Sequence, residues 1–323
     1  MQTAQPRRIE TIDLVRGAAL VAMAIYHFTW DLEFFGYVEP GLTAVGGWKL
    51  FARCIASSFL FLVGVSLVLA HGDGVRWTGF WKRFAMVAGA ALAISAVTFA
   101  ALPAGGIFFG ILHQIAFASV AGLAFLRLPP VVTLVAAAMV VAAPHFLRSE
   151  AFDHPLLWWT GLSTVNPRSN DFVPVFPWFG AVLAGMGAAG LGRRFDVFTE
   201  MAKRTHANWS RPLRLAGRHS LGVYLVHQPV LIGLIWVFSQ AIPPVLDTPE
   251  VAFRKNCERQ CLELRDEDFC TRYCVCFLEE IDKEGDAEAV LAGEAGPETQ
   301  ARFAEIAAWC TAETDGLAPE EGQ

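Results

Sequence analysis

The sequence is short of charged residues. Only 17 % of its 323 residues are Asp, Glu, Lys or Arg, whereas 54 % are hydrophobic and the mean hydropathy is +0.42. A soluble domain carries about 25 % charged residues. The low charged fraction excludes an ordinary soluble protein and predicts an all-α, polytopic membrane protein. The lipid bilayer is therefore an expected partner.

Several informative sequence patterns are absent as well. The chain has no glycine-rich phosphate loop before a basic helix, no heptad run, and no repeat between the halves of its apolar region. These absences argue against a nucleotide-hydrolysing protein and against a coiled coil, and no nucleic-acid partner is expected. They also weaken the case for a transporter, because transporters are often built from inverted repeats.

Seven apolar segments are present, each close to the roughly 20 residues that a helix needs to cross the hydrocarbon core. They cover residues 12–32, 50–70, 83–102, 106–126, 129–147, 172–192 and 220–243. The first segment follows Arg7 and Arg8, is too long for a signal-peptide core and lacks a small-residue cleavage site after it. We therefore expect it to be a retained helix.

Lysine and arginine are concentrated in alternate loops. The basic side includes the N-terminus and, above all, residues 193–218, whereas the intervening loops hold few positive charges. The positive-inside rule then predicts a cytoplasmic N-terminus and a C-terminal tail on the far side of the membrane.

The first apolar segment carries four ionisable groups on one face. At about 100° per residue, a sector of about 80° contains all four together with Leu20 and Met23; the four are Asp13, Arg16, His27 and Asp31. Asp13 and Arg16 are one turn apart, so they either form an interfacial ion pair that anchors the helix or help to recognise a substrate. Asp31 lies one turn from His27 and can orient the imidazole as a general base. The alternative is a buried histidine bonded to a backbone carbonyl.

Four further polar residues are candidate partners for this face: His113, Asp171, Tyr224 and His227. Intramembrane ionisable residues are functional by default. The histidines and the aspartate have structural alternatives, however. Either histidine can form a hydrogen bond that only holds two helices together, and Asp171 can be a helix N-cap.

Four motifs carry a family resemblance: "IDLVRGAALVAMAIYHFTWDL", "GILHQIAF", "DFVPVFPWFGAVLAGMG" and "HSLGVYLVHQPVLIG". Together they resemble the bacterial branch of the heparan-α-glucosaminide N-acetyltransferase catalytic-domain family, within the broader superfamily of transmembrane acyltransferases. The resemblance covers residues 8–240 and leaves out the tail. In lysosomal members, the position that matches His27 is an amide. Their chemistry and their sugar substrate are therefore not carried over to this chain.

The resemblance implies transfer of an acetyl group from cytoplasmic acetyl-CoA to an acceptor, typically a sugar, across the bacterial inner membrane. It places His27 at the functional position of the first helix and Arg16 in its opening motif, with Tyr224 or Arg16 as a possible oxyanion donor. The basic segment that contains Arg193, Arg194 and Arg218 would hold the phosphates of CoA. Its alternative role is to fix the topology alone.

The tail differs from the rest of the chain. Residues 1–246 hold 18 Lys/Arg and 11 Asp/Glu, whereas residues 247–323 hold 7 and 20, together with six of the seven cysteines. The cysteine spacing predicts two antiparallel helices joined by disulfides in an oxidising compartment. Such a hairpin could be joined by Cys257–Cys274 and Cys261–Cys270, which leaves Cys276 and Cys310 for a third bridge, although the spacing does not fix the connectivity. The alternative is an all-thiolate metal site, since no histidine follows His227; we favour disulfides and expect no metal.

The sequence thus predicts two domains, a transmembrane acyltransferase-like domain at residues 1–245 and an acidic, Cys-rich tail at residues 246–323. The tail is expected to be a helical hairpin with one more helix near "EAGPETQARFAEIAAWC" and a disordered end. Two rival functions stay open, a transporter that uses the His/Asp/Arg face as a relay and a non-catalytic scaffold. The acceptor and the oligomeric state are open too.

Overall fold

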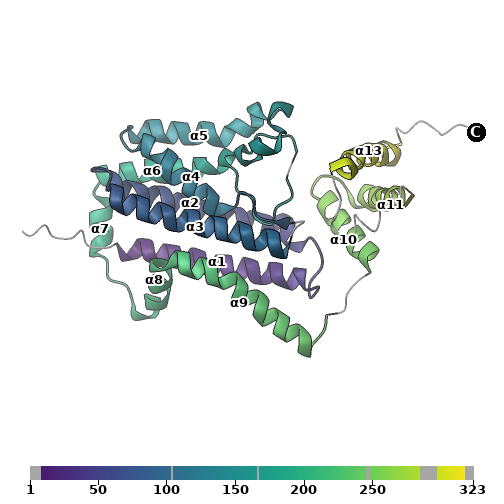
Figure 1. Cartoon of the computed structure of the whole chain (residues 1–323), viewed down its shortest axis with the longest axis horizontal. Coiled ribbons are helices and arrows are strands. Elements are labelled where there is room, and N and C mark those ends of the chain that lie inside the picture. Colours follow the sequence, from purple (N-terminus) through teal and green to yellow (C-terminus); the bar gives the residue numbers. More distant parts are fainter. Residues whose placement is uncertain (1–8, 103–104, 166, 245–247, 284–296, 317–323) are drawn as a thin grey trace, which may run out of the picture. The chain divides into compact units, whose positions relative to one another are not determined.

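The computed structural model describes residues 9–316 except 103–104, 166, 245–247 and 284–296. The described residues form helices and contain no strand, so the predicted all-α class is confirmed (Figure 1). The predicted helix near the C-terminus is present as α13 (Pro297–Thr314), and the predicted disordered end lies outside the described residues.

The predicted apolar segments all appear as helices. They are α1 (Glu10–Phe34), α2 (Gly46–His71), α3 (Trp77–Ala101), α4 (Ile111–Ala121), α5 (Pro130–Leu147), α6 (Val175–Arg194) and α9 (Ser220–Ala241). Among the described residues, six of these helices are long and apolar enough to span a membrane, and α4 with its 3-10 extension (Gly122–Phe125) is a shorter apolar helix. Two short helices, α7 (Val197–Lys203) and α8 (Arg211–Arg218), lie in the basic segment between α6 and α9.

The fourth helix begins later than the sequence predicts, at Ile111 rather than near residue 106. The preceding residues are held instead against α3. The Ile107 N–H donates to Thr98 Oγ1 at 3.0 Å, and Ser95 Oγ donates to the Ile107 carbonyl at 2.5 Å. Side chains of α3 therefore satisfy the backbone of this segment, and it has no need to become helical.

Contacts among the described residues divide the chain into two units. Unit 1 comprises residues 1–23 and 53–227, and unit 2 comprises residues 24–52 and 228–323. The domain boundary near residue 245 that the sequence suggests stays a prediction.

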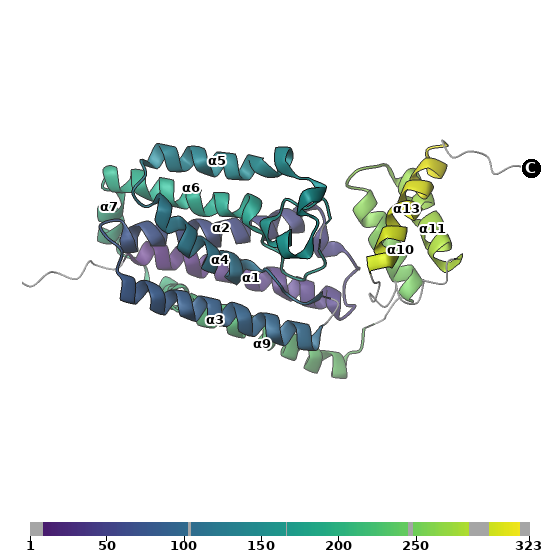
Figure 2. The same cartoon turned by 45° about the horizontal axis from the view of Figure 1, so that its top comes forward.

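Helices of unit 1 approach one another closely at glycines. A Cβ at Gly64 of α2 would lie 2.0 Å from the Val182 carbonyl oxygen, and one at Gly185 of α6 would lie 2.1 Å from the Phe61 carbonyl oxygen. Helix α5 runs alongside α6 (Figure 2), again with glycines of α6 at the contact. Small residues at helix contacts are typical of membrane bundles, in which van der Waals packing replaces the hydrophobic effect as the force between helices.

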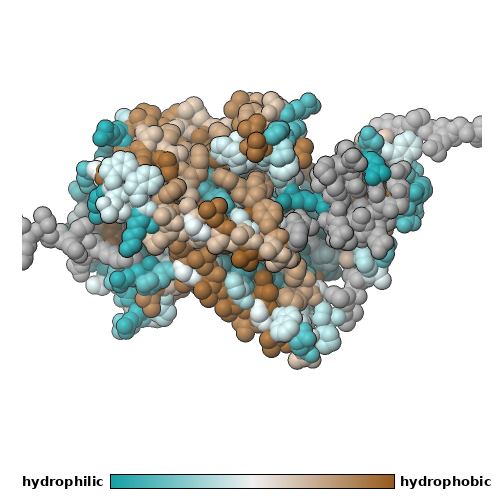
Figure 3. Space-filling view, viewed as in Figure 1, coloured by the Kyte–Doolittle hydropathy of each residue, from teal (hydrophilic) through white to brown (hydrophobic). Residues whose placement is uncertain are grey.

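The surface of unit 1 fits a membrane environment. Hydrophobic residues cover the visible sides of its helices, and hydrophilic residues gather at the end where α7 and α8 lie (Figure 3). On α5, for example, Val131, Val135 and Met139 are more than half exposed. Such a large exposed apolar surface is stable in lipid and unfavourable in water.

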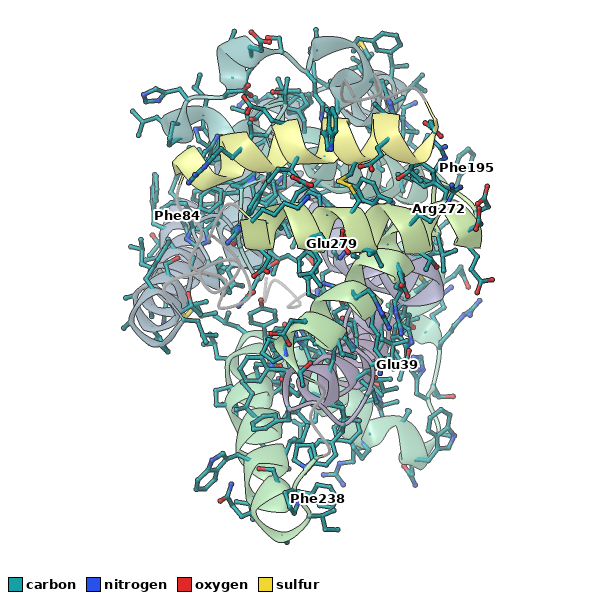
Figure 4. All side chains as sticks on the ribbon, turned by 90° about the vertical axis from the view of Figure 1, so that its right-hand side faces the viewer. Glu39, Phe84, Phe195, Phe238, Arg272 and Glu279 are labelled. Atoms are coloured by element: carbon teal, nitrogen blue, oxygen red, sulfur yellow. A yellow bond between two sulfur atoms is a disulfide. The ribbon has the colours of Figure 1, made fainter. Side chains whose placement is uncertain are left out.

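The tail in unit 2 is a three-helix module made of α10 (Pro249–Cys261), α11 (Glu267–Lys283) and α13. Three disulfides join these helices: Cys257–Cys274, Cys261–Cys270 and Cys276–Cys310. All three predicted bridges are confirmed; Figure 4 shows α11, marked by Arg272 and Glu279, beside α13. The bridges use all six tail cysteines and leave no tail thiolate for the alternative metal site.

Within unit 2, the tail packs against the connection between α1 and α2. Glu263 accepts the Gly46 N–H at 2.9 Å and pairs with Lys49 at 2.5 Å. The same connection is folded around Glu33, whose carboxylate accepts the backbone N–H groups of Gly41 and Thr43. The last turn of α1 is therefore tied to the tail through the residues that follow it.

We expect thiol labelling of the denatured, non-reduced protein to modify one cysteine per chain, Cys54, because it is the one free cysteine among the described residues. Reduction before labelling should raise the number to seven. Intact mass after alkylation measures both numbers. Six additional labels without a reductant would contradict the disulfide assignment.

Candidate active site

The two aspartates of the predicted polar stripe lie on the buried face of α1. Asp13 is 6 % exposed and Asp31 is fully buried, and between them Leu20 and Met23 are also buried. Hydrophobic residues occupy the other faces, such as Val21 and Ile25, which are about half exposed. The predicted polar stripe is thus turned away from the lipid-facing surface, as the cost of charge in hydrocarbon requires.

In unit 1, the first pair of this stripe is joined to α2. Arg16 NH1 lies 3.3 Å from Asp13 Oδ1, and Arg16 NH2 donates to Ser66 Oγ at 2.9 Å. Ser66 in turn donates to the Leu62 carbonyl at 2.6 Å. The guanidinium is therefore held by a carboxylate on its own helix and a hydroxyl on the next.

Two glycines bring α8 against the same part of α1. A Cβ at Gly17 would lie 2.0 Å from the Leu213 carbonyl oxygen, and a Cβ at Gly217 would lie 1.9 Å from the Asp13 carbonyl oxygen. An ion pair between Arg214 and Glu10 supports this contact. The glycine of the Arg16-Gly17 motif thus allows a backbone-to-backbone contact with the basic segment.

A cavity of about 20 Å³ lies next to Ser66. Its polar lining comes from three helices of the bundle: Ser66, His71, Arg83 and Ser119. Hydroxyls, an imidazole and a guanidinium are donors that suit an anionic or carbonyl-bearing ligand.

A second, smaller cavity of about 10 Å³ brings three predicted site residues together. His113 of α4, Asp171 of the α5–α6 connection and Tyr224 of α9 all line it. Asp171 Oδ2 accepts the N–H of Ile111 at 2.9 Å, so this carboxylate caps α4 from another segment of the chain. The sequence placed Asp171 at the mouth of the sixth helix, but α6 begins four residues later, after Pro174. Burial of the carboxyl group raises the pKa of Asp171 to about 6.

His113 has both ring nitrogens engaged. The Gly110 N–H donates to Nδ1 at 3.2 Å, and Nε2 lies 3.3 Å from Ser95 Oγ. Because Ser95 donates its own proton to Ile107, it accepts from His113, which places the imidazole proton on Nε2. A catalytic role for this neutral ring would require one of the two bonds to be exchanged.

His227 is held through its own helix. Its Nδ1 lies 2.6 Å from the Tyr224 carbonyl oxygen, and since a carbonyl can only accept, Nδ1 carries the proton. The rings of the two residues are also in contact, with centroids 5.6 Å apart. Nε2 is then the basic nitrogen of a neutral His227.

In unit 2, Asp31 of α1 is bonded to α9. Gln228 Nε2 donates to Asp31 Oδ1 at 2.6 Å. His27 is one turn earlier on the same helix and packs edge-on against Tyr26, with ring centroids 5.6 Å apart. The C-terminal end of the stripe thus contains an imidazole and a carboxylate, and the carboxylate is bonded to an amide of α9.

The predicted phosphate-binding arginines are dispersed. Arg193 pairs with Asp73, and its side chain packs at Gly72. Arg194 and Arg218 are exposed at the ends of α6 and α8. The described contacts do not bring the three guanidinium groups together.

The sequence alone did not single out Ser66, Arg83 or Gln228 as site residues. A serine or an arginine in a hydrophobic segment gives little signal, because both also occur as packing or topology residues. Gln228 had a usable signal, since it stands between His227 and Pro229 in the "HQP" triplet. A polar residue so close to a candidate histidine indicates a polar helix face.

Fold and site define an all-α membrane protein whose first helix presents ionisable groups to the protein interior. Residues 8–229 match the family model described as heparan-alpha-glucosaminide N-acetyltransferase, catalytic. The chain belongs to this family, and the resemblance inferred from its motifs is confirmed. The family is one of membrane acetyltransferase catalytic domains, so the protein is assigned to the transferases at this level. No curated protein and no solved structure matches the chain.

We expect Gly217→Ala to weaken the contact between α8 and α1, because the added methyl group would overlap a backbone oxygen that cannot rotate away. The free energy of unfolding should fall by about 1–3 kcal/mol. Thermal unfolding in detergent measures the effect. Gly222→Ala is the control, since a Cβ there has no described atom within 4 Å. Equal stability of the two variants would contradict the contact.

We expect the raised pKa of Asp171 to give a pH-dependent stability. The folded protein holds this proton to about pH 6, whereas an unfolded chain releases it near pH 4. Stability should therefore fall as the pH rises from about 4 to 6. Asp171→Asn should flatten this slope in thermal unfolding. Asp153→Asn is the control, because hydrogen bonds from Thr164 and Ser163 lower the pKa of Asp153 and move its titration below this window.

Proposed function

We propose that the protein is an integral membrane acyltransferase that moves an acetyl group from acetyl-CoA to a sugar or another small acceptor on the far side of a bacterial inner membrane. The observation that carries the proposal is the family match, which includes all of α1, a helix with ionisable groups at both ends of its buried face. The disulfides of the tail support an oxidising compartment for the C-terminus.

In this proposal the donor approaches at the end of the bundle that carries α8. Arg16 and the cavity lined by Ser66 and Arg83 supply donors for the carbonyl and phosphate groups of acetyl-CoA. The cavity of about 20 Å³ admits only a few atoms, so the whole donor molecule would need the helices to part. Neutral Tyr224 is a further hydrogen-bond donor for the oxyanion.

The base in this proposal is His27, with Asp31 one turn away. His27 takes the proton from the hydroxyl or amine of the acceptor as its oxygen or nitrogen attacks the thioester carbonyl. The new O–C or N–C bond forms and the C–S bond breaks, and the proton passes from His27 to the CoA sulfur. A general base contributes about 10²–10⁴ in rate.

The two ends of α1 then have separate roles. Arg16 and His27 are eleven residues apart in the sequence of α1, and Arg16 belongs to unit 1 and His27 to unit 2. Substitutions at Arg16 are expected to act mainly on donor affinity, and substitutions at His27 on the chemical step.

We expect His27→Ala to lower acetyl transfer about 10²–10⁴-fold, because the acceptor loses its base. The assay follows radiolabel from acetyl-CoA into a membrane or glycan acceptor in membranes that contain the native chain or the variant. His145→Ala is the matched control, since His145 lies exposed on α5. Equal transfer by the native chain and His27→Ala would remove His27 from the mechanism. If neither the native chain nor His27→Ala transfers the label, the result would favour the rival hypothesis that the protein is a transporter.

A further inference from the structure

The pair formed by Asp31 and Gln228 has a second, unused side. Asp31 is fully buried, and its Oδ1 accepts one hydrogen bond from Gln228. Asp31 Oδ2 and Gln228 Oε1 are buried too, and neither accepts a hydrogen bond from any residue that the structure describes. Burying an unsatisfied acceptor costs about 1–3 kcal/mol, and more for a charged group. Two such atoms on one bonded pair indicate a site for a ligand.

The orientation of the amide follows from the carboxylate. If Gln228 presented its oxygen to Asp31, two acceptors would face one another and repel. With Nε2 bonded to Asp31 Oδ1 at 2.6 Å, Oε1 is left as the outer atom of the amide. The carboxylate thus fixes which amide atom is available to a ligand, and both available atoms are acceptors.

We propose that Asp31 and Gln228 form the recognition site for the acceptor, a polyol or amino alcohol that offers two adjacent hydrogen-bond donors. Two acceptors match neighbouring hydroxyl or amino groups and repel a carboxylate or a phosphate. His27, one turn before Asp31 on the same helix, then serves as the base for one of these donor groups. The assignment of the bound polyol or amino alcohol as the acetyl acceptor rests on the proposed acyl transfer. Its binding by Asp31 and Gln228 does not depend on that transfer.

Gln228 is a specificity residue in this scheme. It touches the acceptor through Oε1 and positions Asp31 through Nε2. Its removal leaves the donor site on Arg16 and Ser66 unchanged, because those residues belong to the other end of the buried face. Substitution of Gln228 is therefore expected to weaken the affinity for the acceptor and to leave the affinity for acetyl-CoA unchanged.

The test uses the full chain purified in detergent and equilibrium binding of radiolabelled glucose and glucosamine without acetyl-CoA. We expect the native protein to bind at least one of these sugars and Gln228→Met to bind it about tenfold more weakly or worse, as the loss of hydrogen bonds to a charged group implies. Asp31→Asn should weaken it as well. The matched control is Gln240→Met, an exposed glutamine near the end of the same helix.

Binding of neither sugar by the native protein would overturn the inference, and so would equal binding by the native protein and a folded Gln228→Met. Thermal unfolding checks that the variant folds. If it does not, Asp31→Asn is the second variant, because it keeps the side-chain volume, and weaker sugar binding by Asp31→Asn carries the test.

Acetyl-transfer kinetics separate this inference from the proposed function. Sugar binding without any transfer would keep the recognition site and reject the enzyme. Transfer with an acceptor KM that Gln228→Met leaves unchanged would keep the enzyme and reject the recognition site. The expected result is a raised acceptor KM with an unchanged KM for acetyl-CoA.

Discussion

The cost of placing a charged or polar group in hydrocarbon determines how this protein is built. Helix α1 is long enough to cross a membrane, and between its terminal glutamates Glu10 and Glu33 it carries Asp13, Arg16, His27 and Asp31, of which both aspartates are buried. Each carboxylate has a partner that lowers the cost, Arg16 for Asp13 and Gln228 for Asp31. In unit 1, Ser66 of α2 and the Gly217 carbonyl of α8 contact Arg16, and in unit 2, Gln228 of α9 contacts Asp31.

Glycine provides the second constraint, because the partners reach α1 only if the backbones come close. Gly17 and Gly217 lie at the same helix contact, one from the opening motif and the other just before the "HSLGVYLVHQP" motif. Two motifs that are far apart in sequence are therefore parts of one packing contact. This also gives the basic segment a structural role in addition to its positive charge, since Arg214 pairs with Glu10 at this contact.

Much of the fold could be predicted from sequence because the governing patterns are local. Apolar length gives the spanning helices, and i,i+4 cysteine spacing on facing helices favours the two bridges between α10 and α11, whereas Cys276–Cys310 follows only as the remaining pair. The start of α4 could not be predicted in this way. Residues 105–110 are apolar enough for a helix, but Thr98 and Ser95 of another helix satisfy the backbone N–H and carbonyl of Ile107.

The candidate site could be predicted only in part, for the same reason. Periodicity shows which α1 residues share a face, and that face is buried. It cannot show that Asp171 caps α4 or that His113 has both nitrogens engaged, because those contacts come from segments distant in sequence. Gln228 is the clearest example, since its significance depends on a carboxylate 197 residues away.

Helix α4 matters for the proposed orientation more than its length suggests. Its eleven α-helical and four 3-10 residues span roughly 25 Å, a little less than a hydrocarbon core of about 30 Å. If α4 did not cross, the six longer helices would return the tail to the side of the N-terminus. The three disulfides would then face a reducing cytoplasm. With α4 as a seventh crossing, which the irregular residues before Ile111 help to complete, the positive-inside rule and the disulfides support the same side for the tail.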